Sequence, residues 1–577
     1  MKNIILLIFC GFSLSVFAQK EDNVWVFGYD FIPSPQNPGA ERIIFNFSDD
    51  SLKIHYSSGS MILYDSYASI CDTAGKLLLL SNGCYIENAN GVAIPNSEGL
   101  NPGKLYDVTC AQHEGYNFPQ NMIMLPDHAL KTKYHLFHIP IDIISGNATA
   151  YGLLHSTFDL SLNNGLGDTE AKNELVVSDM MGNDGLHAVR HANGRDWWII
   201  GSKRFTNKFF IILLDPNGIS VKEQTIGDTL FYDAGGEMVF SPNGEKIALF
   251  DPKNDLNIFD FDRCYGILSN PIHIPLADSD DTQILGAAAW SADSRYLYVS
   301  GSLLVYQFDI TATDVGATKQ LVAEYDPNIF CFLNSTFNWM ELGPDGIIYS
   351  RPANGTTCMN RINHPERPGA ACGVEQRALM FDYAYKNIPN FPNFRLGPVD
   401  GSACDTLGID NHPLAGWRYA RPDILTVDFT SVSWYEPEQW YWTFGDGTVS
   451  TERNPQHVFP GPGPYPVCLT VSNNYGSDTK CKTVWVTTTA TEETPAIARK
   501  GEILVFPNPA SERVFWTKQN ADAPEFIRLY NTLGQLQLEQ QTTDGFIDVK
   551  NLADGIYHLV VQSASGSIRS ANFVIQH

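Results

Sequence analysis

The chain has 577 residues, of which 44% are hydrophobic and 12% aromatic, so it can form several packed cores and does not have the composition of a disordered protein. Its formal net charge at pH 7 is −26. Such an acidic surface repels phosphate backbones and anionic lipids, which excludes nucleic acid as a partner and keeps an exported protein soluble.

Residues 1–18 have the pattern of a cleavable signal peptide. Lys2 is followed by an apolar run from Ile4 to Phe12, and small residues, Val16 and Ala18, precede the expected cleavage point. The apolar run is shorter than the roughly 20 residues that span a bilayer, and no later stretch approaches that length. We therefore predict export to the periplasm and no integral membrane segment.

The cysteines indicate disulfide bonds. Apart from Cys10 in the leader, the chain has ten cysteines, an even number. Outside the inner membrane the environment is oxidising, which favours disulfides. No Cys-x-x-Cys pair occurs, so zinc binding and redox chemistry have no support.

Residues 19–400 read as short apolar runs separated by Gly, Pro, Asn and Asp, which is typical of short β-strands. A turn that leads into an apolar strand recurs at a spacing of about 50 residues. These turn motifs lie at 72–75, 125–128, 191–194, 241–244, 291–294 and 343–346. One four-stranded sheet cannot bury both of its faces alone, and packing such sheets in a ring buries them.

The period predicts an all-β head, a β-propeller of seven blades with six as the alternative. We expect a further blade at 375–397, closed by the strand at 24–27. The head also resembles a propeller family of secreted Bacteroidetes proteins, on stretches such as 81–85 and 390–398. That resemblance implies an architecture and no activity.

After an expected linker at 401–421, residues 422–488 form a second domain. Trp442-Thr443-Phe444-Gly445-Asp446-Gly447 is followed by an alternating strand at 465–471. On these motifs the segment resembles the polycystic-kidney-disease (PKD) domain, an immunoglobulin-like β-sandwich. The resemblance implies a domain that spaces or binds rather than one that catalyses.

Alternation within this domain predicts side-chain directions. Trp442 and Phe444 point inward, and Asp446 lies in a hairpin turn, where stabilising the turn is favoured over a calcium or catalytic role. Cys468 and Cys481 both point outward, and a turn at 474–475 places them opposite each other. Opposed antiparallel positions have Cα atoms roughly 4.5–5.5 Å apart, so we predict a Cys468–Cys481 disulfide.

Residues 489–500 are rich in Thr, Glu and Ala and are expected to form a second linker. The remaining segment, 501–577, carries motifs at 505–510, 527–535 and 552–561. It resembles the type A C-terminal sorting domain of the type IX secretion system of Bacteroidetes bacteria, with Arg569 where the family usually has Lys. The resemblance implies a second immunoglobulin-like sandwich, recognition by the type IX secretion machinery, and release or attachment at the outer cell surface.

The common catalytic templates are absent from the sequence: Gly-x-Ser-x-Gly, a Gly-rich phosphate loop before a helix, His-Glu-x-x-His and an Asp-x-Asp-x-Asp-Gly calcium loop. Cys110 and His113 have the spacing of a thiol nucleophile and its base, but a disulfide-bonded cysteine cannot act as one. The acidic run at 278–281 is more typical of a solvated loop than of a calcium site. We assign no catalytic residue, no metal and no cofactor.

One cluster is retained as a candidate ligand site. His187 and Arg190 precede Trp197 and Trp198, and at a propeller mouth they would contact a ligand or an acidic substrate. The alternative is that the polar residues fix a hairpin while the tryptophans pack between blades. A fold alone does not imply a function, which favours the alternative.

Three functions are compatible with these observations. The first is a secreted or cell-surface binding or adhesion protein without catalysis, whose head recognises a glycan or a protein through loops at one end. The second is a propeller-fold polysaccharide hydrolase or lyase that uses paired carboxylates, and the third is a structural surface-layer component. Carboxylates converging within roughly 5–10 Å in the channel favour the hydrolase, and an apolar plug favours binding or a scaffold.

Overall fold

The computed structural model describes residues 19–486 and 505–576, apart from short segments within them. Those segments are 29–39, 48–51, 66, 111–114, 117, 119, 145–146, 232–235, 277–284, 328–330, 332–334, 507–509, 511, 517–524, 532–534, 543–545 and 564–567. The predicted signal peptide, the linker at 489–500 and the acidic run at 278–281 lie outside the described residues.

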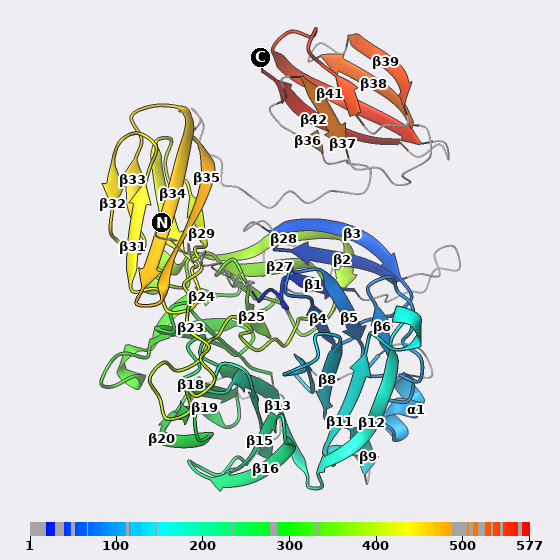
Figure 1. Ribbon diagram of the computed structural model, residues 1–577, viewed down its shortest axis with the longest axis vertical. Coiled ribbons are helices and arrows are strands. Elements are labelled where there is room, and N and C mark those ends of the chain that lie inside the picture. Colours follow the sequence, from blue (N-terminus) through cyan, green and yellow to red (C-terminus); the bar gives the residue numbers. More distant parts are fainter. Residues whose placement is uncertain are drawn as a thin grey trace, which may run out of the picture.

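The head is built from β-strands, and the all-β prediction is confirmed. Its described residues form seven antiparallel sheets of three or four strands, placed around a common centre (Figure 1). The first three sheets contain β1 (Val24–Phe27), β2 (Ala40–Asn46) and β3 (Lys53–Gly59); β4 (Ala68–Cys71), β5 (Leu77–Ser81) and β6 (Ile86–Asn88); and β7 (Met122–Pro126), β8 (Lys133–His138), β11 (Leu153–Asp159) and β12 (Asp168–Val177).

The other four sheets follow a regular order, with neighbours in sequence paired in space. They contain β13 (Met181–Arg190), β14 (Trp197–Lys203), β15 (Lys208–Asp215) and β16 (Gly218–Thr225); β17 (Glu237–Phe240), β18 (Lys246–Asp251), β19 (Asp255–Asp262) and β20 (Ile267–Ile274); β21 (Ala287–Trp290), β22 (Tyr296–Ser300), β23 (Leu304–Asp309) and β24 (Gln320–Glu324); and β25 (Met340–Leu342), β26 (Ile348–Ser350), β27 (Thr356–Ile362) and β28 (Val374–Tyr385). A hairpin, β9 (Ile141–Ile144) with β10 (Asn147–Ala150), lies beside them.

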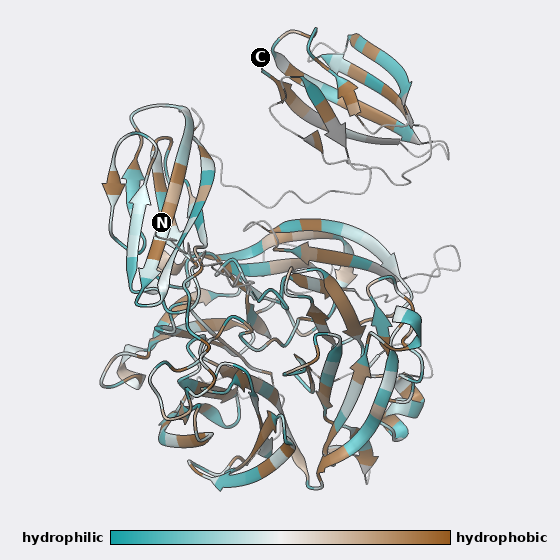
Figure 2. Cartoon of the chain, viewed as in Figure 1, coloured by the Kyte–Doolittle hydropathy of each residue, from teal (hydrophilic) through white to brown (hydrophobic). Residues whose placement is uncertain are grey.

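The first strand of each regular sheet faces the centre of the ring. β7, β13, β17, β21 and β25 pack against one another in succession, and β28 packs against β2. β17 and β21 are buried at every position, whereas the outer strand β16 is mostly exposed and hydrophilic (Figure 2). Burial therefore falls from the centre of the ring to its rim, as in a propeller.

Each of the six turn motifs joins the first two strands of one sheet. In the motif at 241–244, Gly244 has a left-handed φ of 72°, and a Cβ there would lie 2.7 Å from the side chain of Leu396. Glycine meets both demands, because it adopts positive φ without strain and lets a neighbouring segment approach closely. The sequence repeat thus corresponds to a repeated hairpin.

The predicted blade at 375–397 is wrong. β28 is the outer strand of the sheet that begins with β25, and β1 pairs with β2 in a sheet of its own. Trp25 of β1 packs edge-on against Tyr349 of β26, with ring centroids 5.5 Å apart. The first sheet therefore meets the last one through side-chain packing, and β1 forms no strand pair with that sheet. The number of blades stays a prediction, because two of the seven sheets have only three described strands.

The second domain is a two-sheet sandwich. Its sheets contain β29 (Trp417–Ala420), β30 (Thr426–Ser431) and β33 (Gln456–Val458); and β31 (Gln439–Thr443), β32 (Val449–Ser450), β34 (Gly463–Asn473) and β35 (Gly476–Val486). Trp442 and Phe444 are buried in its core as the alternation predicts. β29 lies in the segment expected to be a linker, and Trp417 is fully buried in the same core, so the sandwich begins before residue 422.

Two local predictions for the sandwich agree with the structure. Cys468 and Cys481 stand opposite each other in the β34–β35 hairpin and form a disulfide with a Cα–Cα distance of 4.0 Å. Asp446 accepts hydrogen bonds from the backbone N–H of Thr448 at 2.9 Å and from its hydroxyl at 2.6 Å. Asp446 therefore stabilises the hairpin turn.

The last domain is a second sandwich with a separate core. Its sheets contain β36 (Val505–Phe506), β37 (Arg513–Trp516) and β40 (Phe546–Asp548); and β38 (Glu525–Asn531), β39 (Leu536–Thr542), β41 (Gly555–Ser563) and β42 (Ile568–Ile575). Its core includes Ile527, Leu529, Leu559 and Val561, each fully buried.

Helices are few and short in the described residues. They are α1 (Lys104–Thr109) and the 3₁₀ turns Asn163–Gly165, Gly316–Thr318 and Gly369–Cys372. In this part of the chain no helix has the length and apolar character needed to cross a bilayer.

Candidate functional site

A segment without regular secondary structure crosses the centre of the ring. Residues 387–398, here called the strap, follow β28 and carry asparagines at positions 387, 390 and 393. These asparagines hydrogen-bond to the backbone of four sheets or their turns: Asn387 to Val26 and Gly28, Asn390 to Met122 and Leu186, and Asn393 to Pro242. The strap therefore ties separate sheets together at the channel.

The strap fills the channel mainly with apolar side chains. Ile388, Phe391, Phe394 and Leu396 are all buried. The ring of Phe394 packs edge-on against Trp197, with centroids 5.6 Å apart. A channel plugged in this way is the arrangement that favours a binding or scaffold role over hydrolysis inside the channel.

Arg190, a candidate ligand residue, lies under the strap. One terminal nitrogen donates to the carbonyl oxygen of Phe394 at 3.1 Å and to Oε1 of Gln19 at 3.0 Å. Its guanidinium lies 4.2 Å from the ring centroid of Trp197. The structure thus places Arg190 inside the head, where it holds the strap and not at a solvent-facing mouth.

His187, the other candidate, lines a partly open cavity of about 70 Å³ together with Asp22, Glu341 and Trp434. Its Nδ1 lies 3.1 Å from the carbonyl oxygen of Ala188, which makes Nδ1 the protonated nitrogen. Burial lowers the pKa of His187 to about 4. His187 is therefore a neutral ring at a small, partly open cavity.

The most connected carboxyl group of the channel is Glu237, at the start of β17. It accepts hydrogen bonds from the backbone N–H of Ala288 in β21 at 3.0 Å and of Met340 in β25 at 3.3 Å, and from Nε2 of Gln120 at 3.3 Å. Burial raises the pKa of Glu237 to about 8. Burial and the nearby Glu237 also raise the pKa of Glu341. Carboxyl groups therefore do converge in the channel, which is the feature that favours a hydrolase. Against that role, Glu237 is 1% exposed and is held by backbone N–H groups of two inner strands.

The raised pKa of Glu237 predicts a pH dependence of stability. Between about pH 4.5 and 8 the unfolded chain loses the Glu237 proton and the folded chain keeps it, so the unfolded state binds fewer protons and stability falls as pH rises. Thermal unfolding of the full chain should show this fall between pH 5 and 8. The Glu237→Gln variant should show a smaller fall, and equal slopes for the two proteins would contradict the assignment.

The first sandwich covers one end of the ring. Trp434 reaches the strap, where the guanidinium of Arg395 lies 5.0 Å from its ring centroid, and Arg418 forms an ion pair with Glu366 of the head at 3.3 Å. Gly346, in the turn motif of the last sheet, also lies against this domain. The covered end is the one that carries the turn motifs, so the connections at the opposite end point away from the sandwich.

Two exposed phenylalanines lie at that opposite end. Phe205, between β14 and β15, is 52% exposed, and Phe231, between β16 and β17, is 73% exposed. Their connections are joined by a 3.3 Å hydrogen bond from the N–H of Leu230 to the carbonyl oxygen of Thr206. Exposed aromatic side chains on loops held by a rigid scaffold are typical of binding surfaces. Phe205 and Phe231 are here called the loop patch.

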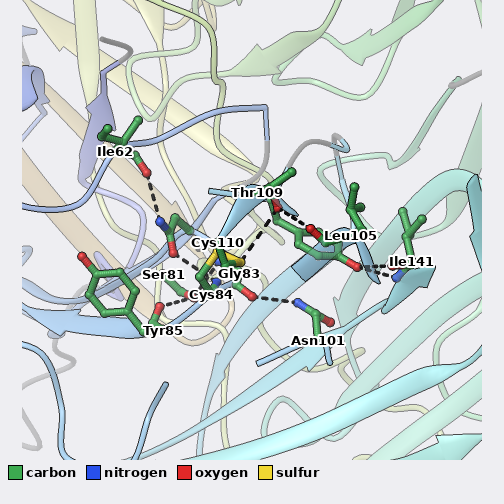
Figure 3. Close-up of a disulfide and its surroundings, with 12 residues drawn as sticks. Ile62, Ser81, Gly83, Cys84, Tyr85, Asn101, Leu105, Thr109, Cys110 and Ile141 are labelled. Atoms are coloured by element: carbon green, nitrogen blue, oxygen red, sulfur yellow. Dashed lines mark hydrogen bonds between the residues drawn. A yellow bond between two sulfur atoms is a disulfide. The ribbon is translucent and has the colours of Figure 1, made fainter. Parts of the chain in front are cut away.

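The Cys110 nucleophile is excluded by the structure. Cys110 is bonded to Cys84, which fastens the end of α1 to the turn after β5 (Figure 3). The other described disulfides are Cys264–Cys404, Cys331–Cys358 and Cys468–Cys481. Cys71 and Cys372 are unpaired and buried, so the expectation that disulfides take up the cysteines holds for eight of the ten.

The strap, Glu237 and the loop patch do not follow from the sequence patterns. The strap had a usable signal, since Asn387, Asn390 and Asn393 are spaced by three residues with prolines between them. Glu237 had none, because a single acidic residue before an apolar strand is ordinary. The loop patch joins the connections before β15 and after β16, and only the fold shows that they lie at the same end of the ring.

Comparisons with known proteins identify two of the domains. Residues 422–488 match the family model of the PKD domain, and residues 504–576 match that of the secretion system C-terminal sorting domain. A curated relative, collagenase ColA of Bacillus cereus, is 52% identical over 42 residues, which is 7% of this chain and 4% of the collagenase. The chain thus spans a small fraction of that relative.

Solved structures are similar to parts of the chain at low overall scores. The PKD1 domain of the Vibrio cholerae metalloprotease PrtV is 31% identical, with 13% of this chain and 99% of that chain covered and a TM-score of 0.13. PorZ, a surface component of the type IX secretion system of Porphyromonas gingivalis, is 12% identical. The match covers 94% of this chain and 80% of PorZ, with a TM-score of 0.23.

The sorting domain determines the location of the protein. A type IX sorting domain directs export, so the protein is placed at the cell surface or outside the cell and interacts with the secretion machinery. This agrees with the export predicted from the leader and tail motifs.

Proposed function

We propose that this protein is a non-catalytic binding or adhesion protein of the outer cell surface, whose head recognises a glycan or protein ligand through the loop patch. The observation that carries the proposal is the plugged channel. Apolar strap residues fill it, and Glu237 within it is only 1% exposed, so a ligand has to bind at the periphery of the ring.

The loop patch supports this position for the ligand. The sandwich covers the opposite end of the ring, and the sheet faces are used for packing. The guanidinium of Arg204 lies 4.7 Å from the ring centroid of Phe205. This contact restricts the ring of Phe205, which stands on a short connection between paired strands. An aromatic ring on a short, anchored connection binds at a low cost in conformational entropy.

Glycan and surface-protein arrays probed with the full chain test the proposal. The Phe205→Ala, Phe231→Ala double variant should lose roughly tenfold in affinity for the ligand found, because truncating central aromatic contacts typically costs more than 1 kcal/mol. Tyr265→Ala removes an aromatic ring that is 56% exposed on the β19–β20 connection and serves as the matched control.

Two results would count against the proposal. Equal losses for the double variant and for Tyr265→Ala would remove the loop patch as the site. Turnover of a polysaccharide that one carboxylate substitution abolishes would identify a hydrolase or lyase instead.

A further inference from the structure

A groove of about 740 Å³ lies between two neighbouring sheets of the head, away from the loop patch. One side is formed by β8, β11 and β12, and the other by β16 and the β15–β16 turn. It is here called the β12–β16 groove. Neither the channel nor the sorting function uses it.

A chain of hydrogen-bonded side chains runs into this groove. Asp127 accepts the backbone N–H groups of Ala129 and Leu130, each at 2.8 Å. Its Oδ2 lies 3.0 Å from Nε2 of His135, and Nδ1 of His135 lies 2.9 Å from Nε2 of His155. Burial opposes ionisation of Asp127, but these backbone N–H bonds and His135 give it a lowered pKa, so it is a carboxylate.

The carboxylate fixes the tautomers of both rings. Asp127 only accepts, so Nε2 of His135 carries the hydrogen and its Nδ1 is an acceptor. Nε2 of His155 must then donate to that Nδ1. Burial lowers the pKa of His135 and lowers that of His155 to about 3, which keeps both rings neutral. Nδ1 of His155 is therefore left with a lone pair.

That lone pair faces a second acceptor. Nδ1 of His155 lies 3.6 Å from Oε2 of Glu174, whose side chain is 63% exposed in the groove. Two acceptors at this separation are stabilised by a donor placed between them. The lining of the groove also includes the carboxylates of Asp215 and Glu170 and one lysine, Lys133. Nζ of Lys133 lies 2.7 Å from Oε2 of Glu170. The charge and the free acceptors of the groove suit a cationic donor.

The walls of the groove identify the kind of cation. Leu175 and Val221 line it and are 60% and 42% exposed. Its described lining has no Phe, Tyr or Trp, the large rings on which a sugar face stacks. Exposed aliphatic walls above acidic acceptors match a lysine side chain, which has a methylene stem and an ammonium head.

We propose that the β12–β16 groove binds a lysine side chain of a partner protein. The ammonium donates to Nδ1 of His155 and to the carboxylate of Glu174, and the methylene stem packs on Leu175 and Val221. This makes the groove a protein-docking site separate from the loop patch.

The test uses the full chain and a fluorescently labelled tetralysine peptide. Glu174→Gln should weaken binding about tenfold, the effect of losing one charge-assisted hydrogen bond. Glu324→Gln, an exposed glutamate on the outer strand β24 of another sheet, should leave binding unchanged. The Nε-acetylated peptide should not bind, and the ring resonances of His155 should shift when the unmodified peptide is added.

Three outcomes would overturn the proposal. Equal weakening by Glu174→Gln and Glu324→Gln would show attraction by surface charge only. Binding of chitosan oligosaccharides that depends on Glu174, with no peptide binding, would identify an amino-glycan site. Binding of the acetylated peptide would exclude the ammonium. The Phe205→Ala, Phe231→Ala variant should still bind tetralysine, which separates this site from the loop patch.

Discussion

The Glu237→Ala variant is expected to be less stable than the wild type by about 4 kcal/mol, a large part of the stability of an ordinary domain. Removing the carboxyl group leaves the backbone N–H groups of Ala288 and Met340 buried without a partner and opens a cavity between three inner strands. Glu237→Gln keeps the volume and one acceptor oxygen, so its loss should be clearly smaller.

Urea unfolding of the full chain, followed by tryptophan fluorescence, measures these differences. Glu324→Ala removes an exposed glutamate on β24 and should change the midpoint little, so it serves as the control. A loss for Glu237→Ala no larger than that of Glu324→Ala would show that the channel does not depend on this carboxyl group.

Deletion of residues 501–577 is expected to abolish export and leave the protein in the periplasm. The sorting domain carries the export signal, and its core, which includes Ile527 and Leu559, is separate from the cores of the head and the first sandwich. Domains with separate cores fold independently, so the truncated protein should keep its ligand binding.

Fractionation of the native host measures the result. Leu559→Asp places a charge in the fully buried core of the tail and should block export as the deletion does. Ile556→Asp, on the same strand and 55% exposed, is the matched control and should be exported. Truncated protein at the cell surface or in the medium would contradict the assignment of the tail.

The sequence by itself determined the features that depend on local geometry. The alternation of Trp442 and Phe444 predicts their burial, because side chains on a strand alternate between its two faces. The Cys468–Cys481 pair follows from the register of a single hairpin. The turn motifs predict the repeated hairpins, since a tight turn between two strands restricts residue type within a few positions.

The tertiary structure decided what depends on meetings between distant segments. The strap asparagines donate hydrogen bonds to the backbone of Val26, Met122, Leu186 and Pro242. The sequence of the strap does not predict which residues these partners are. For the same reason the sequence left open whether Arg190 lies at an open mouth or inside the head, and the structure shows that the strap covers it. Strand periodicity specifies which face of a segment is apolar, but not which segment, hundreds of residues away, will bury it.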